Sequence, residues 1–332
     1  MAAIRGLFYG AAIATRHLND PAFVAALLQE CGMIVSEWEA QWAALEPVRG
    51  KPDYTALDRL VEFAASNGLL FRGHSGIWYK RVPDWFGAIN DRAEAERLML
   101  EHVQAKFSRY RGRVQSWDVL NEAVDLRSGR PDGLRREVLL DKFGPGYIDL
   151  LFHAARAADP QALLCYNDYG VEYDTPWHTG RREAILALLR GCRSRGVPVD
   201  VFGIQAHLRI GARFNADIWA RWLDEVAGLG IKLMITEIDV TDAAAPGDIA
   251  ERDRQVAAEY ERFLAPTLKS PAIIGMLAWG LSDRYSWIVR GTEPYHKRPD
   301  GLPPRPLPLD ADLKRKPAWQ AMADAFGGLP SR

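Results

Sequence analysis

The chain has 332 residues, of which 48% are hydrophobic and 26% charged, so it can bury a sizeable core and is not a disordered protein. Its formal net charge of −1 leaves no excess of Lys and Arg to neutralise phosphates, which argues against a nucleic-acid partner. No apolar run reaches the roughly 18 residues of a membrane-spanning helix, so we expect no membrane contact. The N-terminus lacks the long apolar core of a signal peptide, which leaves the cellular location open.

Short β-rich runs alternate along the chain with amphipathic runs of 10–15 residues. The pattern predicts eight strands, near 7–13, 33–38, 69–78, 116–122, 162–169, 199–208, 232–240 and 273–281. It predicts helices between them, over 21–30, 54–67, 92–110, 145–158, 181–193, 216–229 and 249–264. Eight strand–helix units in this length predict an α/β protein with one (β/α)8 TIM barrel, a single catalytic domain over 1–332. An open doubly wound sheet is less favoured, because only Tyr9-Gly10-Ala11, and no Gly-x-Gly-x-x-Gly, follows the first strand.

Three cysteines, Cys31, Cys165 and Cys192, are widely spaced and lie in apolar or helical surroundings. We expect them to be buried free thiols. Neither they nor the histidines show the spacing of a zinc site, so we expect no metal and no cofactor.

Polar and aromatic residues follow seven of the eight predicted strands at their carboxyl ends, where barrel enzymes place their chemistry. These residues are Glu37, Trp38, His74, Trp78, Asn121, Glu122, Asn167, Tyr169, Gln205, His207, Glu237, Asp239 and Trp279. A single glutamate in such a place is as often part of a structural ion pair as of an active site. Seven strands that end in this way favour one shared site.

Glu122 and Glu237 each close an apolar run, and burying such a carboxylate is costly unless it is paired or used. Cleavage of a glycosidic bond needs one protonated carboxyl group and one ionised carboxylate, so this pair predicts glycoside hydrolysis. Asn121 can bind a sugar hydroxyl beside the reacting carbon. Asp239 shares the strand parity of Glu237, and His207 could bridge the two carboxylates.

Tryptophan rings at or just beyond strand ends can stack on the apolar face of a sugar, and we favour this role for Trp78, Trp279 and Trp287. By contrast, Trp219 and Trp222 are spaced as packing residues of a helix.

With these residues in place, the chain resembles glycoside hydrolase family 10, the endo-β-1,4-xylanase family, nearly from end to end. The motifs that carry the resemblance are Arg72-Gly73-His74, Trp117-Asp118-Val119-Leu120-Asn121-Glu122-Ala123, Asn167-Asp168-Tyr169, Gly203-Ile204-Gln205-Ala206-His207, Thr236-Glu237-Ile238-Asp239 and Ala278-Trp279-Gly280. The resemblance implies a retaining hydrolase of β-1,4-xylosidic bonds, with Glu237 as nucleophile and Glu122 as acid and then base. It also implies that the reacting sugar is lined by Asn121, His74, Gln205, His207, Trp279 and Trp287. Family members are mostly secreted.

The stretch Glu37-Trp38-Glu39-Ala40-Gln41-Trp42 departs from the family pattern Glu-Asn-Glu-Met-Lys-Trp. The Asn and Lys of that pattern hold the second sugar on the glycone side, and they are replaced here by Trp38 and Gln41. Tyr79 likewise replaces a histidine that follows Trp78. These departures leave open an alternative substrate, short oligosaccharides or aryl and other small β-glycosides. A barrel that binds carbohydrate without cleaving it is disfavoured because both glutamates are present. We expect the protein to be a monomer and its only binding partner to be a carbohydrate.

Overall fold

A computed structural model describes residues 2, 6–245, 247–291 and 293–330 of the chain. Its strands are β1 (Phe8–Ile13), β2 (Met33–Ser36), β3 (Leu70–Gly73), β4 (Ile77–Trp78), β5 (Ser116–Asn121), β6 (Leu163–Asp168), β7 (Val201–Ile204), β8 (His207–Arg209), β9 (Lys232–Thr241) and β10 (Ile273–Ala278). Its α-helices are α1 (Pro21–Glu30), α2 (Trp42–Leu45), α3 (Thr55–Ser66), α4 (Asp84–Gly87), α5 (Arg92–Arg109), α6 (Val138–Phe143), α7 (Tyr147–Ala158), α8 (Pro176–Ser194), α9 (Ala216–Ala227), α10 (Ile249–Thr267), α11 (Trp287–Arg290) and α12 (Pro317–Gly327). Short 3₁₀ turns include η2 (Thr15–Asn19), η3 (Tyr79–Arg81), η4 (Leu126–Ser128), η5 (Asp283–Tyr285) and η6 (Pro294–His296).

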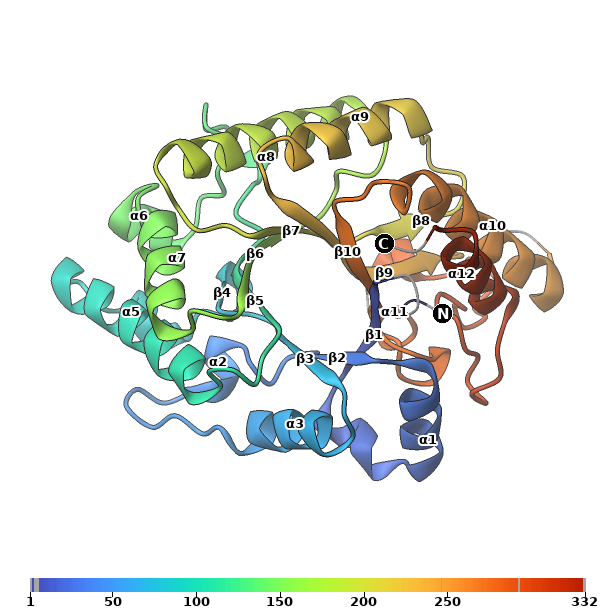
Figure 1. Cartoon of the computed structure of the whole chain (residues 1–332), viewed down its shortest axis with the longest axis horizontal. Helices are drawn as coiled ribbons and strands as arrows, with labels where there is room; N and C mark the ends of the chain where they lie inside the picture. The colour runs from blue at the N-terminus through green and yellow to red at the C-terminus, as the bar shows by residue number, and fades with distance from the viewer. Residues whose placement is uncertain (1, 3–5, 246, 292, 331–332) are drawn as a thin grey trace.

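The strands form a closed parallel barrel, as the sequence predicted. The hydrogen-bonded order is β10-β1-β2-β3-β5-β6-β7-β9, and β9 pairs with β10 to complete the ring. Figure 1 looks into this ring, with the helices around it. The junction of the first and last barrel strands runs from the pair Phe8 and Gly275 to the pair Ala11 and Ala278. The fold is therefore a (β/α)8 barrel.

Two predicted strands are each divided in the structure. The range 69–78 becomes β3 and β4, and the range 199–208 becomes β7 and β8. At the first division the chain runs so close to β5 that a Cβ on Gly73 would lie 2.0 Å from the ring of Trp117. At the second, Ala206 adopts a left-handed backbone with φ of 59°. Both divisions turn the chain at the edge of the barrel where polar residues gather.

The predicted helices are present, and their starts follow from capping chemistry. Asp20 accepts hydrogen bonds from the backbone nitrogens of Ala22 and Phe23 at the start of α1. Asp91 and Asn215 cap α5 and α9 in the same way. The prediction for α8 began at residue 181, but that helix begins at Pro176, behind the cap Thr175.

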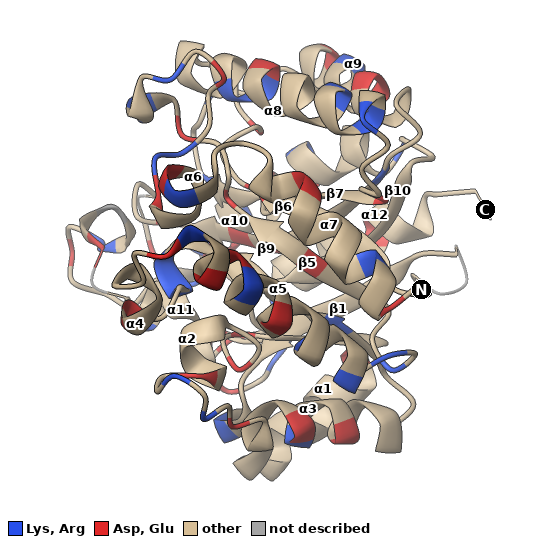
Figure 2. Ribbon diagram, turned by 90° about the vertical axis from the view of Figure 1, so that its left-hand side faces the viewer, with Lys and Arg blue, Asp and Glu red and all other residues tan. Residues whose placement is uncertain are grey.

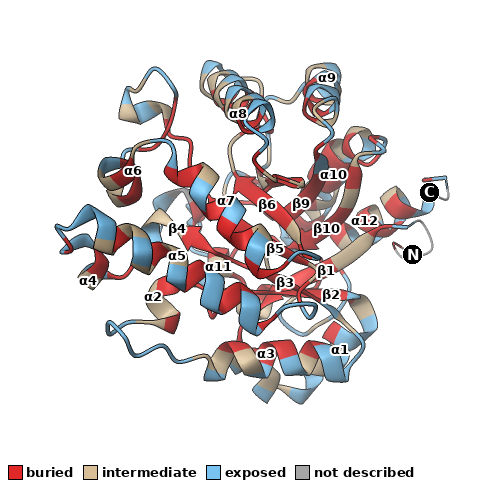
Figure 3. Ribbon diagram, turned by 60° about the vertical axis from the view of Figure 1, so that its left-hand side comes forward, coloured by how far each residue is buried: buried red, intermediate tan, exposed pale blue. Residues whose placement is uncertain are grey.

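The apolar core lies inside the ring and between the ring and the helices (Figure 3). Charged side chains of both signs are spread over the outer helices (Figure 2). Cys31, Cys165 and Cys192 are buried and free, as predicted. Among the described residues, no helix is long and apolar enough to cross a membrane.

Candidate active site

A cleft of about 680 Å³ opens at the carboxyl ends of the barrel strands. It is lined by Arg16, Glu37, Trp38, Gln41, His74, Trp78, Lys80, Arg81, Asn121, Glu122, Tyr169, Gln205, His207, Glu237, Trp279, Trp287, Arg290, Gly291 and Glu293. Every side chain that the sequence analysis singled out for catalysis or sugar binding is in this set. Asp239 lies beneath the cleft, where it contacts two of the lining residues.

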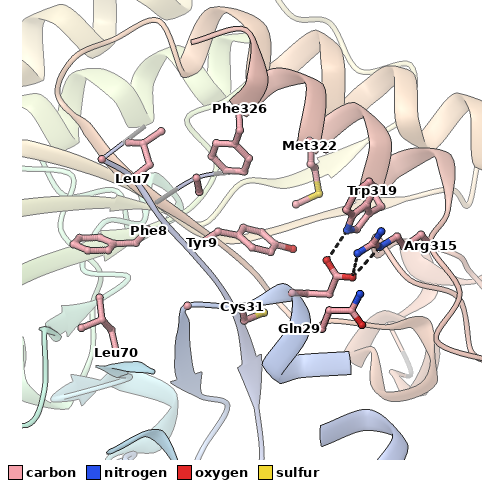
Figure 4. A pocket seen from close by; sticks show the side chains of 15 residues that line it. Leu7, Phe8, Tyr9, Gln29, Cys31, Leu70, Arg315, Trp319, Met322 and Phe326 are labelled. Atoms are coloured by element: carbon pink, nitrogen blue, oxygen red, sulfur yellow. Dashed lines mark hydrogen bonds and ion pairs between the residues drawn. The ribbon is translucent and has the colours of Figure 1, made fainter. Parts of the chain in front are cut away.

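A second cavity, of about 750 Å³, lies at the opposite end of the barrel (Figure 4). It is lined mainly by apolar side chains from the start of β1 and from α12, such as Leu7, Tyr9 and Phe326. Its polar edge is internally paired, because Glu30 accepts hydrogen bonds from Arg315 (2.8 Å) and from the indole of Trp319 (2.8 Å). The cavity holds no convergent acid–base pair, so the chemistry belongs to the cleft.

Glu122 sits directly after β5, in a left-handed backbone conformation with φ of 59°. A non-glycine residue in this region carries strain of about 1–3 kcal/mol, which is typical of functional positions. The conformation is held by hydrogen bonds to its main chain. The Glu122 amide donates to the Asn167 carbonyl (2.9 Å), and Arg135 Nε donates to the Glu122 carbonyl (2.8 Å).

The carboxyl group of Glu122 is buried and only lightly hydrogen-bonded. Gln205 Nε2 approaches one of its oxygens at 3.2 Å, and Asn121 Nδ2 approaches the same oxygen at 3.5 Å. Burial raises the pKa of Glu122, and the negative charge of Asp168 adds to this, although Lys80 opposes it. This surrounding favours a carboxyl group that keeps its proton.

Glu237 has the opposite surrounding, because donors hold both of its oxygens. Asn167 Nδ2 donates to Oε1 (2.8 Å), and His207 Nε2 lies 3.2 Å from Oε2. The other ring nitrogen of His207 bonds to Asp239 (2.9 Å), which also accepts from the indole of Trp287 (2.7 Å). The bridge that the sequence suggested between Glu237, His207 and Asp239 is thus present.

Burial lowers the pKa of His207, but the charges of Asp239 and Glu237 outweigh it and hold that pKa well above its usual value. A raised pKa favours the protonated imidazole, which can donate from both nitrogens, to Glu237 and to Asp239. The two glutamates are thus suited to different chemical roles.

An amide network joins the strands that carry the two glutamates. Asn167 on β6 donates to the side-chain oxygen of Asn121 on β5 (2.9 Å) as well as to Glu237 on β9. The Asn167 oxygen accepts in turn from Thr236 (2.7 Å). The network fixes the orientation of the Asn121 amide beside Glu122.

His74 is held from below by a buried charge chain. Its Nδ1 lies 2.9 Å from Asp118, which is also bonded to Arg72. Burial lowers the pKa of His74, but the hydrogen bond to Asp118 outweighs it and the net pKa is raised. The ring packs against the edge of Trp279, with centroids 5.2 Å apart.

Tyr169 and Trp78 complete the predicted set from two further loops. The Tyr169 hydroxyl accepts from Arg135 (3.0 Å), and its ring carries the guanidinium of Arg181 at 4.2 Å. Trp78, at the end of β4, has the ammonium of Lys80 at 5.3 Å from its ring.

The segment after β2 brings Glu37, Trp38 and Gln41 to the cleft. The Glu37 carboxylate is bonded to Arg16 (2.8 Å) and Arg290 (3.2 Å). Trp38 is 41% exposed, a large value for a tryptophan. Gln41 is buried and reaches the Glu37 carbonyl at 3.4 Å. A bulky indole and a carboxylate paired with two arginines therefore line this part of the cleft.

A buried lysine supports this segment from behind. Lys106 Nζ donates to the carbonyls of Ala40 (2.9 Å), Ser75 (2.8 Å) and Gly76 (3.1 Å), and it lies 3.0 Å from His102 Nε2. It therefore ties α5 to the loops that carry Trp38 and His74.

Sequence reasoning missed several of these residues. The sequence analysis listed Asn167 only as a polar residue at a strand end. That position was the signal that could have marked it as part of the site. Arg16, Lys80 and Arg81 stand in short turns, where charged residues usually mean a solvated surface. Within the described residues, no group of three or more His, Cys, Asp or Glu side chains is arranged to hold a metal ion.

Comparison with known proteins gives a consistent result over the whole chain. The family model of glycosyl hydrolase family 10 matches residues 1–325. Endo-1,4-beta-xylanase 1 of Humicola insolens is 30% identical over 323 residues, which span 96% of this chain and 71% of that protein. Xylanase 10B of Thermotoga petrophila, solved in complex with xylobiose, superposes with a TM-score of 0.86 at 27% identity, over 98% of this chain and 95% of that one. A thermostable mutant of a xylanase (Xyn10A) from Cellvibrio japonicus gives the same TM-score and identity, over 98% of this chain and 99% of that one.

Proposed function

Because the chain belongs to glycosyl hydrolase family 10 and is therefore a glycoside hydrolase, we propose that it cleaves β-1,4-xylosidic bonds in xylan or xylo-oligosaccharides by retaining double displacement. The observation that carries the proposal is the contrast between two buried glutamates in one cleft. Glu122 has a raised pKa, whereas Glu237 accepts hydrogen bonds at both oxygens.

In the first step, Glu237 attacks the anomeric carbon while Glu122 gives its proton to the departing glycosidic oxygen. The carbon–oxygen bond to the leaving sugar breaks as the bond to Glu237 forms. In the second step, Glu122 takes a proton from water, whose oxygen attacks the same carbon and releases Glu237. For this mechanism we expect the two carboxyl groups to lie about 5–5.5 Å apart.

The other cleft residues serve binding in this proposal. Asn121, Gln205 and His74 offer polar groups to the hydroxyls of the reacting sugar. His207, which is held by Asp239, bonds to Glu237 and orients it for attack. Aromatic faces that can stack on sugar rings come from Tyr169, Trp78, Trp279 and Trp287.

A second candidate is a β-glycosidase that acts on short oligosaccharides or on aryl and other small β-glycosides. Trp38 and Gln41 favour it, because an exposed indole and a buried amide stand where the family pattern has the asparagine and the lysine that hold the second glycone sugar. Rates on polymeric xylan and on 4-nitrophenyl β-xyloside separate the two candidates. Faster cleavage of the polymer would remove the second one.

The nucleophile is tested with Glu237→Ala and a 4-nitrophenyl β-xyloside. We expect kcat to fall by about 10⁴-fold or more, the scale seen when a covalent nucleophile is deleted. Added azide should then restore turnover and give the α-configured glycosyl azide, because a small anion can attack from the face that the carboxylate left. Normal turnover by Glu237→Ala would overturn the assignment of the nucleophile.

A further inference from the structure

The strand β8, which carries His207, stands outside the ring of barrel strands. It pairs in parallel with β9, with His207 opposite Asp239 and Arg209 opposite Thr241, and among the described strands it has no other partner. The ring of His207 bonds to Glu237 (3.2 Å) and to Asp239 (2.9 Å). The contacts that fix β8 in place therefore also fix the contact of His207 with Glu237.

Two consecutive residues of the loop after β6 hold β8 at its two ends. The Glu172 carboxylate accepts a hydrogen bond from the amide of Ala206, the residue directly before β8 (3.1 Å). The Tyr173 hydroxyl accepts from the amide of Arg209, the last residue of β8 (2.6 Å), and lies 3.3 Å from the Arg209 carbonyl. We name Glu172 and Tyr173 the β8 clamp. The clamp engages backbone groups on either side of His207.

The β8 clamp is itself attached to a helix of the outer layer. Glu172 and Tyr173 are buried, and so is Arg182 on α8. The Arg182 guanidinium donates to the carbonyls of Val171 (2.9 Å) and Tyr173 (2.8 Å). The loop that carries the clamp thus has a fixed support behind it, and it can hold β8 in one position.

The backbone of Ala206 shows what the contact with Glu172 does. Ala206 has a left-handed conformation with φ of 59°, which a non-glycine residue keeps only where its surroundings enforce it. Its amide is buried, so without the Glu172 carboxylate it would lack a partner, and an extended backbone would be less strained. A change of backbone at this position would redirect the side chain of the next residue, His207.

The carboxyl group of Glu172 lies near His207 but not in the cleft. Both residues line a cavity of about 430 Å³ that adjoins the cleft, whereas Glu172 is not among the residues that line the cleft itself. Burial raises the pKa of Glu172, and hydrogen bonds from backbone amides and the charge of His207 oppose this. An effect of Glu172 on catalysis would therefore pass through His207 rather than through contact with the sugar.

We propose that Glu172 and Tyr173 are positioning residues for the nucleophile: by holding β8 at both ends, they keep His207 against Glu237. The inference rests on the proposed function, because it concerns the orientation of the same nucleophile. Loss of the β8 clamp should slow the attack of Glu237 although neither clamp residue reaches the reacting carbon.

The test is a double-mutant cycle with His207→Ala, in which kcat/KM is measured on 4-nitrophenyl β-xyloside. We expect Glu172→Ala to lower kcat/KM by about tenfold in the wild-type background, because a small misplacement of a reacting group is costly. In the His207→Ala background the same change should cost less than about twofold, because the contact that it disturbs is already absent. Glu172→Gln, whose side-chain oxygen can still accept from Ala206, should stay within about twofold of wild type.

Tyr173→Phe tests the other end of the β8 clamp and removes only a hydroxyl group. We expect it to lower kcat/KM by about threefold, the size of one hydrogen bond, and to have little effect in the His207→Ala background. If Glu172→Ala does not fold, Tyr173→Phe carries the same cycle.

A second background makes the test independent of His207→Ala. In Glu237→Ala rescued with azide, the attacking group is no longer a residue of the chain, so Glu172→Ala should again cost less than about twofold. Asp159→Ala is the matched control, because the buried Asp159 also accepts from backbone amides, those of Gln161 (3.1 Å) and Ala162 (3.3 Å), but lies before β6 and away from β8. It should keep the wild-type kcat/KM.

Equal losses from Glu172→Ala in the wild-type and His207→Ala backgrounds would overturn the positioning role, as would a wild-type rate in Glu172→Ala. A Glu172→Gln variant as slow as Glu172→Ala would also overturn it, because the hydrogen bond to Ala206 would then not be the cause. Failure of the wild-type chain on xylan, xylo-oligosaccharides and 4-nitrophenyl β-xyloside would instead overturn the proposed function.

Discussion

At the scale of single residues, the fold gives two buried glutamates different surroundings. Glu122 has two weak amide neighbours, at 3.2 and 3.5 Å, and the repulsion of Asp168, whereas Glu237 is bonded to His207 and to the amide of Asn167. Both carboxyl groups are buried. The difference therefore comes from the donors, and these stand on β6 and β8 rather than beside the glutamates in sequence.

Lys80 offers a test of the proton on Glu122. Its positive charge lowers the pKa of Glu122, so Lys80→Met should raise that pKa further. The first step needs a protonated Glu122, and activity is lost as pH rises through its pKa. We therefore expect the alkaline limb of the kcat/KM profile to move to higher pH in this variant. Lys269→Met, in a turn at the other end of the barrel, should keep the wild-type limb, and a limb that moves down in Lys80→Met would contradict Glu122 as the acid.

The sequence could predict that these residues line one cleft, because they follow strand ends and the barrel gathers such ends on one face. Apart from the bridge of His207 with Glu237 and Asp239, it did not predict which of them touch. The pairing of Glu37 with Arg290 joins positions 253 residues apart, and Arg290 lies at the end of the short helix α11. The left-handed backbone conformation of Glu122 could not be predicted either, because the residue at this position is not a glycine.

At the scale of elements, capping and alternation predicted most helices and strands, and the errors lie where tertiary contacts override them. The strand predicted over 199–208 reads as one apolar run, yet it is divided between Ile204 and His207. The Ala206 amide donates to the carboxylate of the buried Glu172 (3.1 Å) instead of extending the strand. This contact with Glu172, which is distant in sequence, turns the chain, and no local sequence pattern predicts it.

Asp20 provides a prediction at this scale. It caps α1 and also accepts from Arg284 (2.7 Å) and Tyr285 (2.9 Å), which ties the helix to η5. The hydrogen bond from Phe23 and the contacts with Arg284 and Tyr285 lower the pKa of Asp20 from 3.8 to about 2. Because the pKa of Asp20 is lower in the folded protein than in the unfolded chain, the ionised carboxylate stabilises the folded state. This stabilisation is fully present above the pKa of the unfolded chain and is lost as pH falls through about 2.

We therefore expect Asp20→Ala to lower the urea midpoint at pH 7, and the deficit to shrink steadily between pH 4 and pH 2. Asp312→Ala, at an exposed turn, is the control and should show little change. A deficit that is independent of pH over that window would assign the effect to the loss of packing rather than to the charge.

At the scale of the whole molecule, the barrel positions its rim loops through a few buried polar side chains. Lys106 is the clearest case, since it is completely buried and donates to three carbonyls in two loops. Burial lowers its pKa well below the usual value. Lys106→Met would keep most of the apolar part of the side chain but leave these carbonyls without their donor.

Each unsatisfied buried acceptor costs about 1–3 kcal/mol, so we expect Lys106→Met to lose at least about 2 kcal/mol of unfolding free energy. Urea unfolding followed by tryptophan fluorescence measures this. Lys142→Met, which removes a partly exposed lysine that donates to Gly87 (3.3 Å), is the comparison and should cost less. Equal stability of Lys106→Met and wild type would show that the two loops keep their positions without this lysine.

Closure of the ring by strands from both halves of the chain has a consequence for a protein split into two fragments. Glu122, which follows β5, and Glu237 on β9 belong to different halves of the polypeptide, and the strand pairs β10–β1 and β5–β6 join these halves into the ring. Fragments separated in the surface turn around residue 160 should be inert singly and should recover turnover when mixed, provided that they reassemble. The rate of nitrophenol release would then measure how much of the fragment mixture has reassembled into an active barrel.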